Sequence, residues 1–225
     1  NRWKRLPRWS RISIWSAGVI VLLFVLLFGL LTWYVNNNKK ALISQINDAV
    51  KEKVVGNFNI EDLDVTIFKN FPNIAIRLKN VTLSDSLYHK HQRNLLALEE
   101  VYVFVKTGSL FSTKKKVKRV TLANGRFDLF TNEDGYTNGY LLKGKGEEVK
   151  DKKEQPNMYD IDVIALENVA FSIAQLPKNK AIQFRIDQLK GLLYSEGKIV
   201  TIKTDIDADI EQLGFNLKKG AFLKN

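Results

Sequence analysis

The chain has no cysteine, one methionine, two histidines and four prolines among its 225 residues. Without cysteine it can form no disulfide framework, thiolate metal site or thiolate nucleophile. The two histidines, His89 and His91, cannot assemble a three-histidine zinc site, and we expect both in an exposed loop. No P-loop, Rossmann or nucleophile-elbow motif is present. These absences predict a protein that is not an enzyme and uses no cofactor or metal.

The chain has no acidic residue before Asp48. The net charge is +11, and residues 1–11 carry five of the basic side chains. Those five are Arg2, Lys4, Arg5, Arg8 and Arg11. An excess of positive charge before an apolar segment indicates a cytoplasmic N-terminus. We therefore predict a cytoplasmic basic tail at 1–11 and place the bulk of the chain across the membrane.

The segment Ile12–Tyr34 is a run of 23 residues without charge. As a helix it would be about 34 Å long, enough to cross a hydrocarbon core of about 30 Å. Trp9 and Trp15 at one end, with Trp33 and Tyr34 at the other, suit the two membrane interfaces. The run is too long, and its end too bulky, for a cleaved signal peptide. We predict a transmembrane helix at 12–35.

Residues 36–56 are expected to form a separate, short amphipathic helix. Asn36–Asn38 offers an N-cap, apolar residues from Leu42 recur at helical spacing, and Gly56 offers a C-terminal stop. This helix could cover the end of a sheet or lie flat on the membrane. Asp48 and Glu52 on its polar face favour the sheet, because a membrane-surface helix is usually strongly basic.

After Gly56 the apolar residues recur about every second position and no longer every 3.6 residues, which predicts a mainly β domain at 57–225. We expect a curved antiparallel sheet that forms an open apolar groove, with a mobile charged loop at 143–157. The expected strands centre on Leu63–Phe68, Asn73–Leu78, Leu98–Val105, Arg119–Leu122, Arg126–Phe130, Val169–Ile173, Gln183–Ile186 and Ile199–Ile210. Tight turns are expected at Asn124-Gly125, Asp134-Gly135, Asn138-Gly139 and Glu196-Gly197.

The segment Val200–Ile210 alternates most clearly, with apolar residues or Thr at even positions and Thr, Lys or Asp at odd ones. Its apolar side either packs as ordinary core or lines the groove. Asp205, Asp207 and Asp209 are interpreted as a solvated face, since alternate strand positions lie too far apart to share a calcium ion. The candidate groove-lining residues are Ile74, Ile76, Leu78, Val101, Val103, Val105, Phe127, Leu129, Val200, Ile202, Ile206 and Ile210.

A basic cluster remains, formed by Lys114, Lys115, Lys116, Lys118 and Arg119. Nucleic acid is excluded as its partner by the predicted topology, which places the cluster outside the cytoplasm. It is either a solvated hairpin tip or a contact for anionic lipid headgroups.

Three segments carry a resemblance to a known family: DLDVTIFKNFPNIAIRLKNVTLSDS (Asp62–Ser86), LLALEEVYVFVKTGSLFS (Leu95–Ser112) and VKRVTLANGRFDLFTNEDGYTNGYLL (Val117–Leu142). Together with the preceding anchor they resemble the N-terminal region of the AsmA-like proteins of Gram-negative envelopes. The family's turn has Asp-Gly-x-x-Asn followed by Trp; here Asp134, Gly135 and Asn138 match, but Gly139-Tyr140 follows.

The resemblance implies a single-pass inner-membrane protein whose periplasmic part is a repeating β-groove, related to the TamB and chorein type of bridge-like lipid carrier. Such a protein would conduct phospholipid from the inner towards the outer membrane in envelope biogenesis. Its partners would be membrane phospholipids and envelope proteins. The alternative is a non-enzymatic structural or assembly subunit that docks on another envelope protein. Because family members are longer, we expect this chain to be the membrane-proximal piece of one.

Overall fold

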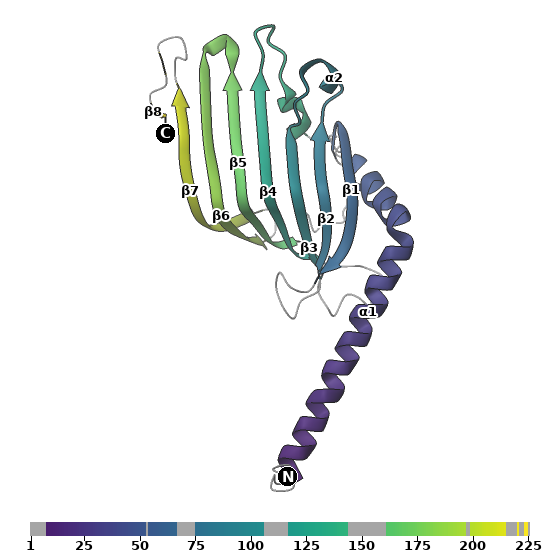
Figure 1. Ribbon diagram of the computed structural model, residues 1–225. Coiled ribbons are helices and arrows are strands. Elements are labelled where there is room, and N and C mark those ends of the chain that lie inside the picture. The colour runs from purple at the N-terminus through teal and green to yellow at the C-terminus, as the bar shows by residue number, and fades with distance from the viewer. Residues whose placement is uncertain are drawn as a thin grey trace.

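In the computed structural model, a long N-terminal helix runs up to one edge of an open, curved β-sheet (Figure 1). The structure describes residues 8–52, 54–66, 75–105, 117–143, 161–196, 199–214, 220 and 223–224. Strands dominate the part after the helix, which confirms the prediction of a mainly β chain behind a long apolar helix. The sheet does not close into a barrel.

Helix α1 spans Arg8–Lys51, and its apolar portion makes it a candidate membrane span by length and composition. The predicted start of a second helix at Asn36–Asn38 is wrong, because α1 continues through these residues without a break. The side-chain amide of Asn38 donates to the carbonyl oxygen of Tyr34 at 2.8 Å, a bond one turn back within the helix. Packing of Val35, Leu42 and Ile46 on the sheet holds this end of the helix in place.

The described residues form eight strands of one sheet, in which spatial order follows chain order. Their bounds are β1 Asn57–Thr66, β2 Ala75–Ser84, β3 Leu96–Val105, β4 Val117–Thr131, β5 Ile161–Gln175, β6 Lys180–Glu196, β7 Ile199–Gly214 and β8 Leu223–Lys224. Three short helices lie in connections: α2 Tyr88–His91, η3 Asn138–Lys143 and η4 Leu176–Lys178. Every expected strand centre that falls on described residues lies within one of these strands.

Strands β4 and β5 are parallel, whereas the other neighbouring pairs are antiparallel. The prediction of a wholly antiparallel sheet is therefore wrong at this pair. A parallel pair needs a crossover of a dozen or more residues, and segment 132–160 supplies that length. The period-2 pattern is the same in both kinds of pairing, so the pattern could not reveal it.

Asn124-Gly125 lies inside β4 and is not a turn, so the two strands expected around it are one strand of 15 residues. Asn124 has φ of 52°, which interrupts the strand without ending it. A Cβ atom on Gly125 would lie 2.8 Å from the Cα of Leu98, so only glycine fits against β3 there. Asp134-Gly135 does lie in a turn, with Gly135 at φ of 82°. Asn138-Gly139 begins η3 instead.

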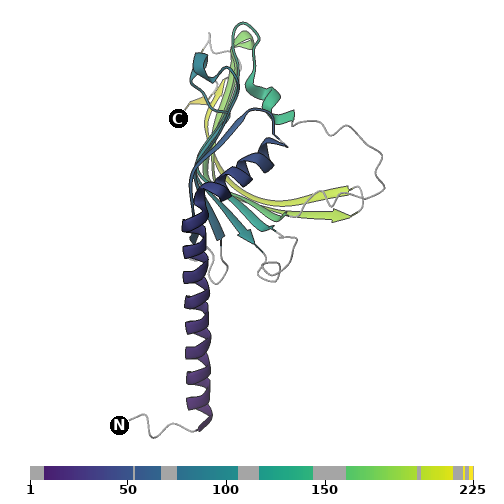
Figure 2. The ribbon, with the colours of Figure 1, turned by 90° about the vertical axis from the view of Figure 1, so that its right-hand side faces the viewer.

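The interruption at Asn124 is part of a row that crosses six strands. The pairing register skips one residue in each strand at the same level: Glu61, Asn80, Glu99, Asn124, Asn168 and Asp187. The three asparagines of this bulge row all have φ near 50°. Each skipped residue shifts the alternation by one, so Leu78 and Val81, three residues apart, face the same side. Bulges also bend strands, and Figure 2 shows that the sheet curves along its strands.

Candidate apolar binding face

One face of the sheet is apolar from β1 to β7. The register aligns two rows of large apolar residues across the strands, one on each side of the bulge row. The first row is Leu63, Leu78, Val101, Leu122, Leu166, Leu189 and Ile206. The second is Phe58, Leu83, Leu96, Phe127, Phe171, Phe184 and Ile210.

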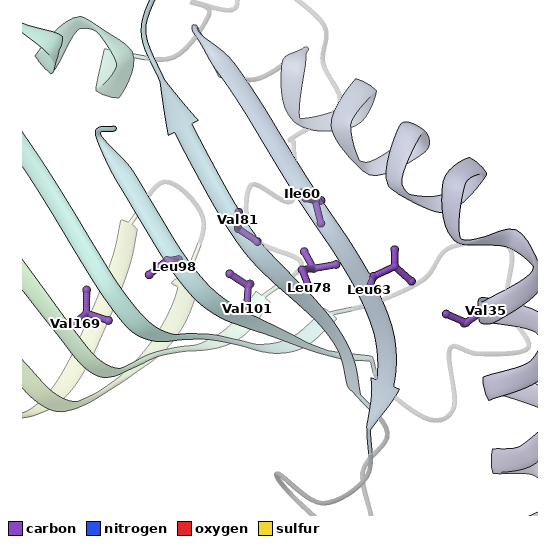
Figure 3. Close-up of a cluster of buried hydrophobic side chains, with 8 residues drawn as sticks. All are labelled: Val35, Ile60, Leu63, Leu78, Val81, Leu98, Val101 and Val169. Atoms are coloured by element: carbon purple, nitrogen blue, oxygen red, sulfur yellow. The ribbon is translucent and has the colours of Figure 1, made fainter. Parts of the chain in front are cut away.

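The β1–β3 part of this face is covered within the chain. Residues of α1, among them Val35, Leu42 and Ile46, pack against a cluster of buried side chains that lies mainly on these strands and extends to Val169 on β5 (Figure 3). Leu78 is 5% exposed and Val101 is 7% exposed. This part is therefore ordinary hydrophobic core that docks α1 on the sheet.

Towards β7 the same face becomes exposed. Ile206 is 61% exposed and Ile210 is 51% exposed, and on β5 Ile164 is 37% exposed. The rings of Phe171 and Phe184 stack at 5.0 Å on the β5–β6 part of the face. Large apolar side chains that stay in water next to one another mark a binding surface more often than isolated ones do. We take the β5–β7 part as the candidate site.

The predicted groove-lining residues divide between these two parts. Those with described side chains share the apolar face: Ile76, Leu78, Val101, Val103, Phe127, Leu129, Ile206 and Ile210. Leu78 and Val101 belong to the core under α1, and Ile206 and Ile210 to the exposed part. Ile74 and the side chains of Val105, Val200 and Ile202 lie outside the described residues.

Sequence reasoning missed the face residues of β5 and β6, such as Leu166 and Leu189. A repeated motif could have found them, because each of β2, β4 and β5 contains Leu-x-Asn followed by an apolar residue three positions after the Asn. The copies are Leu78–Leu83, Leu122–Phe127 and Leu166–Phe171. Each motif brings two apolar residues to one face across a bulge, which a search for strict alternation does not detect.

The opposite face carries ion pairs that link α1 to the sheet, beside a small buried cluster that includes Tyr102 and Phe104. The ammonium of Lys39 on α1 lies 2.9 Å from the carboxylate of Asp62 on β1, and Lys79 on β2 lies 3.2 Å from it. The hydrogen bond from Lys39 is the main reason that the pKa of Asp62 falls to about 2. Arg77 extends the network by pairing with both Asp64 and Glu100. These contacts fix the direction in which α1 leaves the sheet.

Two residues of the predicted headgroup cluster are described. Lys118 is exposed near the start of β4, and the guanidinium of Arg119 lies 6.0 Å from the ring centroid of Phe104. Lys114, Lys115 and Lys116 lie outside the described residues. A role in headgroup contact stays a proposal.

The expectation that both histidines are exposed is wrong for His91. Its Nε2 lies 2.9 Å from the carboxylate of Asp85, which is 1% exposed. The backbone N–H of Arg93 donates to Nδ1 of His91 at 3.1 Å, so Nε2 carries the hydrogen that faces Asp85. The hydroxyl of Tyr136 also donates to Asp85, at 2.5 Å. This buried network links α2 to the segment that leads into η3.

A cavity of about 800 Å³ lies along the bulge row. Polar side chains such as Asn168, Asp187 and Asp207 line it, together with Leu166, Leu189 and Ile206 of the first apolar row. Against an acyl chain the polar groups would lose water without gaining partners. We therefore keep the exposed apolar face as the candidate site. Asp205, Asp207 and Asp209 are exposed, and no described cluster of histidine or acidic residues is arranged to hold a metal ion.

No protein-family model matches the chain, and no curated protein matches its sequence. The functional argument therefore rests on the geometry of the sheet and on the resemblance given above.

Proposed function

We propose that this protein is a membrane-anchored, AsmA-like lipid carrier that holds phospholipid acyl chains on the β5–β7 part of its apolar face. The observation that supports this most strongly is the exposure of Ile206 and Ile210 at the end of apolar rows that cross seven strands. In this proposal α1 spans the inner membrane, the sheet lies in the periplasm, and phospholipid moves towards the outer membrane.

Physical chemistry supports an acyl chain as the ligand. Each methylene group left in water costs about 0.8 kcal/mol, so a lipid outside a bilayer needs a continuous apolar surface. The candidate face offers branched and aromatic side chains, Leu166, Phe171, Phe184 and Leu189, beside the exposed isoleucines. Movement of a lipid along such a surface breaks no covalent bond, which agrees with the absence of catalytic motifs. Lys118 and Arg119, with the neighbouring lysines, would contact anionic headgroups.

The anchor supports the same proposal. Because α1 packs on β1 and pairs with Asp62 through Lys39, it occupies the β1 side of the apolar face and leaves the β7 side open. A lipid taken from the membrane would therefore bind away from α1, on the exposed strands.

The test is the lipid content of the full chain purified in a mild detergent. Native mass spectrometry should show bound phospholipid, and Ile206→Asp should lower its amount by about fivefold or more while the far-ultraviolet circular dichroism stays that of a β protein. Gln188→Glu is the matched control, since it adds one negative charge on the opposite face of the neighbouring strand. A folded, lipid-free chain, or equal lipid loss in both variants, would contradict the proposal.

A second candidate function is an assembly subunit that docks on another envelope protein. It is favoured by one specific observation, the exposure of Ile206 and Ile210, since an exposed apolar surface can also dock another protein.

A further inference from the structure

A second cavity lies where α1 meets the β1 edge of the sheet (Figure 1). Its volume is about 590 Å³, which is within the usual range for sites that hold small molecules. Residues 36–41 and Ile43 of α1 line it, together with Glu61 and Asp62 of β1. We call it the junction cavity. It shares no lining residue with the β5–β7 part of the apolar face.

The position of the junction cavity along α1 places it at a membrane surface if α1 spans the bilayer, as in the proposed function. The exposed rings of Trp33 and Tyr34 suit the interface at the end of the uncharged segment. Along the helix axis, Asn36 lies about 3 Å and Lys40 about 9 Å beyond Tyr34. The headgroup region of a bilayer is about 5–7 Å thick on each side. Helical side chains also lean towards the N-terminus, which is the membrane side here. The cavity therefore opens at the level of lipid headgroups.

The lining carries two ammonium groups and two carboxylates, and one of each lacks a partner of opposite charge. Lys39 and Asp62 pair with each other at 2.9 Å. Lys40 is exposed, and no carboxylate in the described part of the chain pairs with it. The exposed carboxylate of Glu61 accepts a hydrogen bond from the neutral amide of Asn80 at 2.5 Å, and no described cation pairs with it.

An unpaired charge of each sign suits a ligand that carries both. Lys40 and the exposed side-chain amides of Asn36 and Asn37 can donate hydrogen bonds to a phosphate. A primary ammonium can donate to Glu61, whereas a quaternary ammonium has no N–H to donate. An anionic headgroup without an ammonium would meet the carboxylate of Glu61 with charge of the same sign.

We propose that the junction cavity binds the headgroup of a phospholipid that carries a phosphate and a primary ammonium. The phosphate would lie on Lys40 of α1 and the ammonium on Glu61 of β1, so the headgroup would fix the height of the sheet above the bilayer. The acyl chains would stay in the bilayer beside α1. This lipid is distinct from the one on the β5–β7 part of the apolar face, and the inference rests on the proposed function only in that α1 spans a membrane.

The experiment measures which lipids stay bound to the full chain. The protein is reconstituted with equal amounts of phosphatidylethanolamine, phosphatidylcholine and phosphatidylglycerol, extracted in a mild detergent and examined by native mass spectrometry. The ethanolamine lipid should be retained at least about fivefold more than either of the others. Glu61→Gln should abolish this preference, because it removes the charge with little change of shape. Lys40→Gln should lower the retention of all three lipids, since each has a phosphate.

Matched controls separate the cavity from general effects of charge. Glu99→Gln changes the exposed residue at the same level of the bulge row on β3, and Lys178→Gln changes an exposed lysine of η4. Both should leave retention unchanged. Soluble glycerophosphoethanolamine at the concentration of the lipid should not displace it, because it lacks the acyl chains that hold the lipid beside α1. Circular dichroism establishes that each variant is folded.

The outcomes distinguish this inference from the lipid-carrier proposal. Equal retention of the three lipids, a preference for another of them, the same loss in Glu99→Gln as in Glu61→Gln, or displacement by the soluble headgroup would overturn the junction cavity as a lipid site. The ethanolamine preference should persist in the Ile206→Asp chain. If it persists while Ile206→Asp removes no lipid, the junction cavity is supported and the lipid-carrier proposal is contradicted.

Discussion

A buried carboxylate, Asp85, organises the end of the sheet that lies away from the N-terminal half of α1. It accepts hydrogen bonds from the backbone N–H of Leu87 at 3.0 Å and from the hydroxyl of Tyr136, and His91 lies against it. Burial, followed by the nearby carboxylate, raises the pKa of Tyr136 well above its ordinary value. A fully buried carboxylate needs such donors, because losing one leaves charge without compensation.

Removal of one donor should therefore weaken the fold. Tyr136→Phe is expected to lower the free energy of unfolding by roughly 1.5–3 kcal/mol, the usual range for a hydrogen bond to a charged group. Urea unfolding followed by circular dichroism measures it. Tyr88→Phe is the control, since the Tyr88 side chain is 36% exposed and removal of its hydroxyl should cost little. Equal effects of the two substitutions would show that Asp85 does not depend on Tyr136.

The ion pair between Lys39 and Asp62 is the other contact that depends on single residues. The Asp62 side chain is 36% exposed, so solvent screens the pair and its contribution is modest despite the large pKa shift. Its importance is geometric, because it joins α1 to β1 on the face opposite the apolar rows.

This pair predicts a pH dependence with a definite sign. The pKa of Asp62 is about 2 in the folded chain, below its ordinary value of 3.8, so its contribution is present above about pH 4 and is lost as pH falls through 2. Asp62→Asn should lower the free energy of unfolding by roughly 0.5–1 kcal/mol near neutral pH. Urea titrations should show that this difference shrinks towards pH 2. A difference that grows on acidification, or one matched by Asp134→Asn in an exposed turn, would contradict this account.

At the scale of elements, the bulge row decides how the strands lie. Residues Asn80, Asn124 and Asn168 hold a left-handed backbone conformation, which asparagine and glycine adopt at lower cost than other residues. Because all strands from β1 to β6 are interrupted at the same level, neighbours stay in register and the apolar side chains stay on one face. The curvature of the sheet follows from the same row.

Substitution at Asn124 tests the row. Asn124→Val should lower the free energy of unfolding by roughly 1–3 kcal/mol, because a β-branched residue is strained at φ of 52°. Asn124→Gly should cost less than about 1 kcal/mol, since glycine tolerates this conformation. Asn59→Val, at an exposed position of β1 without positive φ, is the control and should be close to neutral. Unfolding in urea measures all three, and equal losses for Val and Gly at position 124 would rule out backbone strain as the cause.

The positions of the strands could be predicted from the sequence, because apolar residues at every second position indicate a β-strand. The merging of two expected strands at Asn124-Gly125 could not, since an Asn-Gly pair suits both a hairpin turn and a bulge. The parallel pair β4 and β5 was missed for a similar reason, because the strand pattern does not record the direction of the neighbour.

At the scale of the whole molecule, α1 and the sheet form an asymmetric arrangement. The helix packs on the β1 side of the apolar face, whereas Ile206 and Ile210 on β7 are exposed, so one continuous surface is core at one end and exposed at the other. Leu78 and Ile206 were both predicted to line the groove, because each belongs to a segment in which apolar and polar residues alternate. Leu78 is buried because it packs in one cluster with residues of α1, whereas Ile206 on β7 is exposed. Such long-range packing cannot be predicted from local periodicity.

The most direct test of the lipid proposal is photocrosslinking inside a Gram-negative cell envelope. A photoreactive residue at position 206 or 210 should capture phospholipid, detected by mass spectrometry of the purified chain. The same residue at position 207 or 188, on the polar side, should capture roughly tenfold less or none. Capture confined to the polar side, or the absence of any lipid adduct at 206 and 210 in a folded chain, would contradict the account.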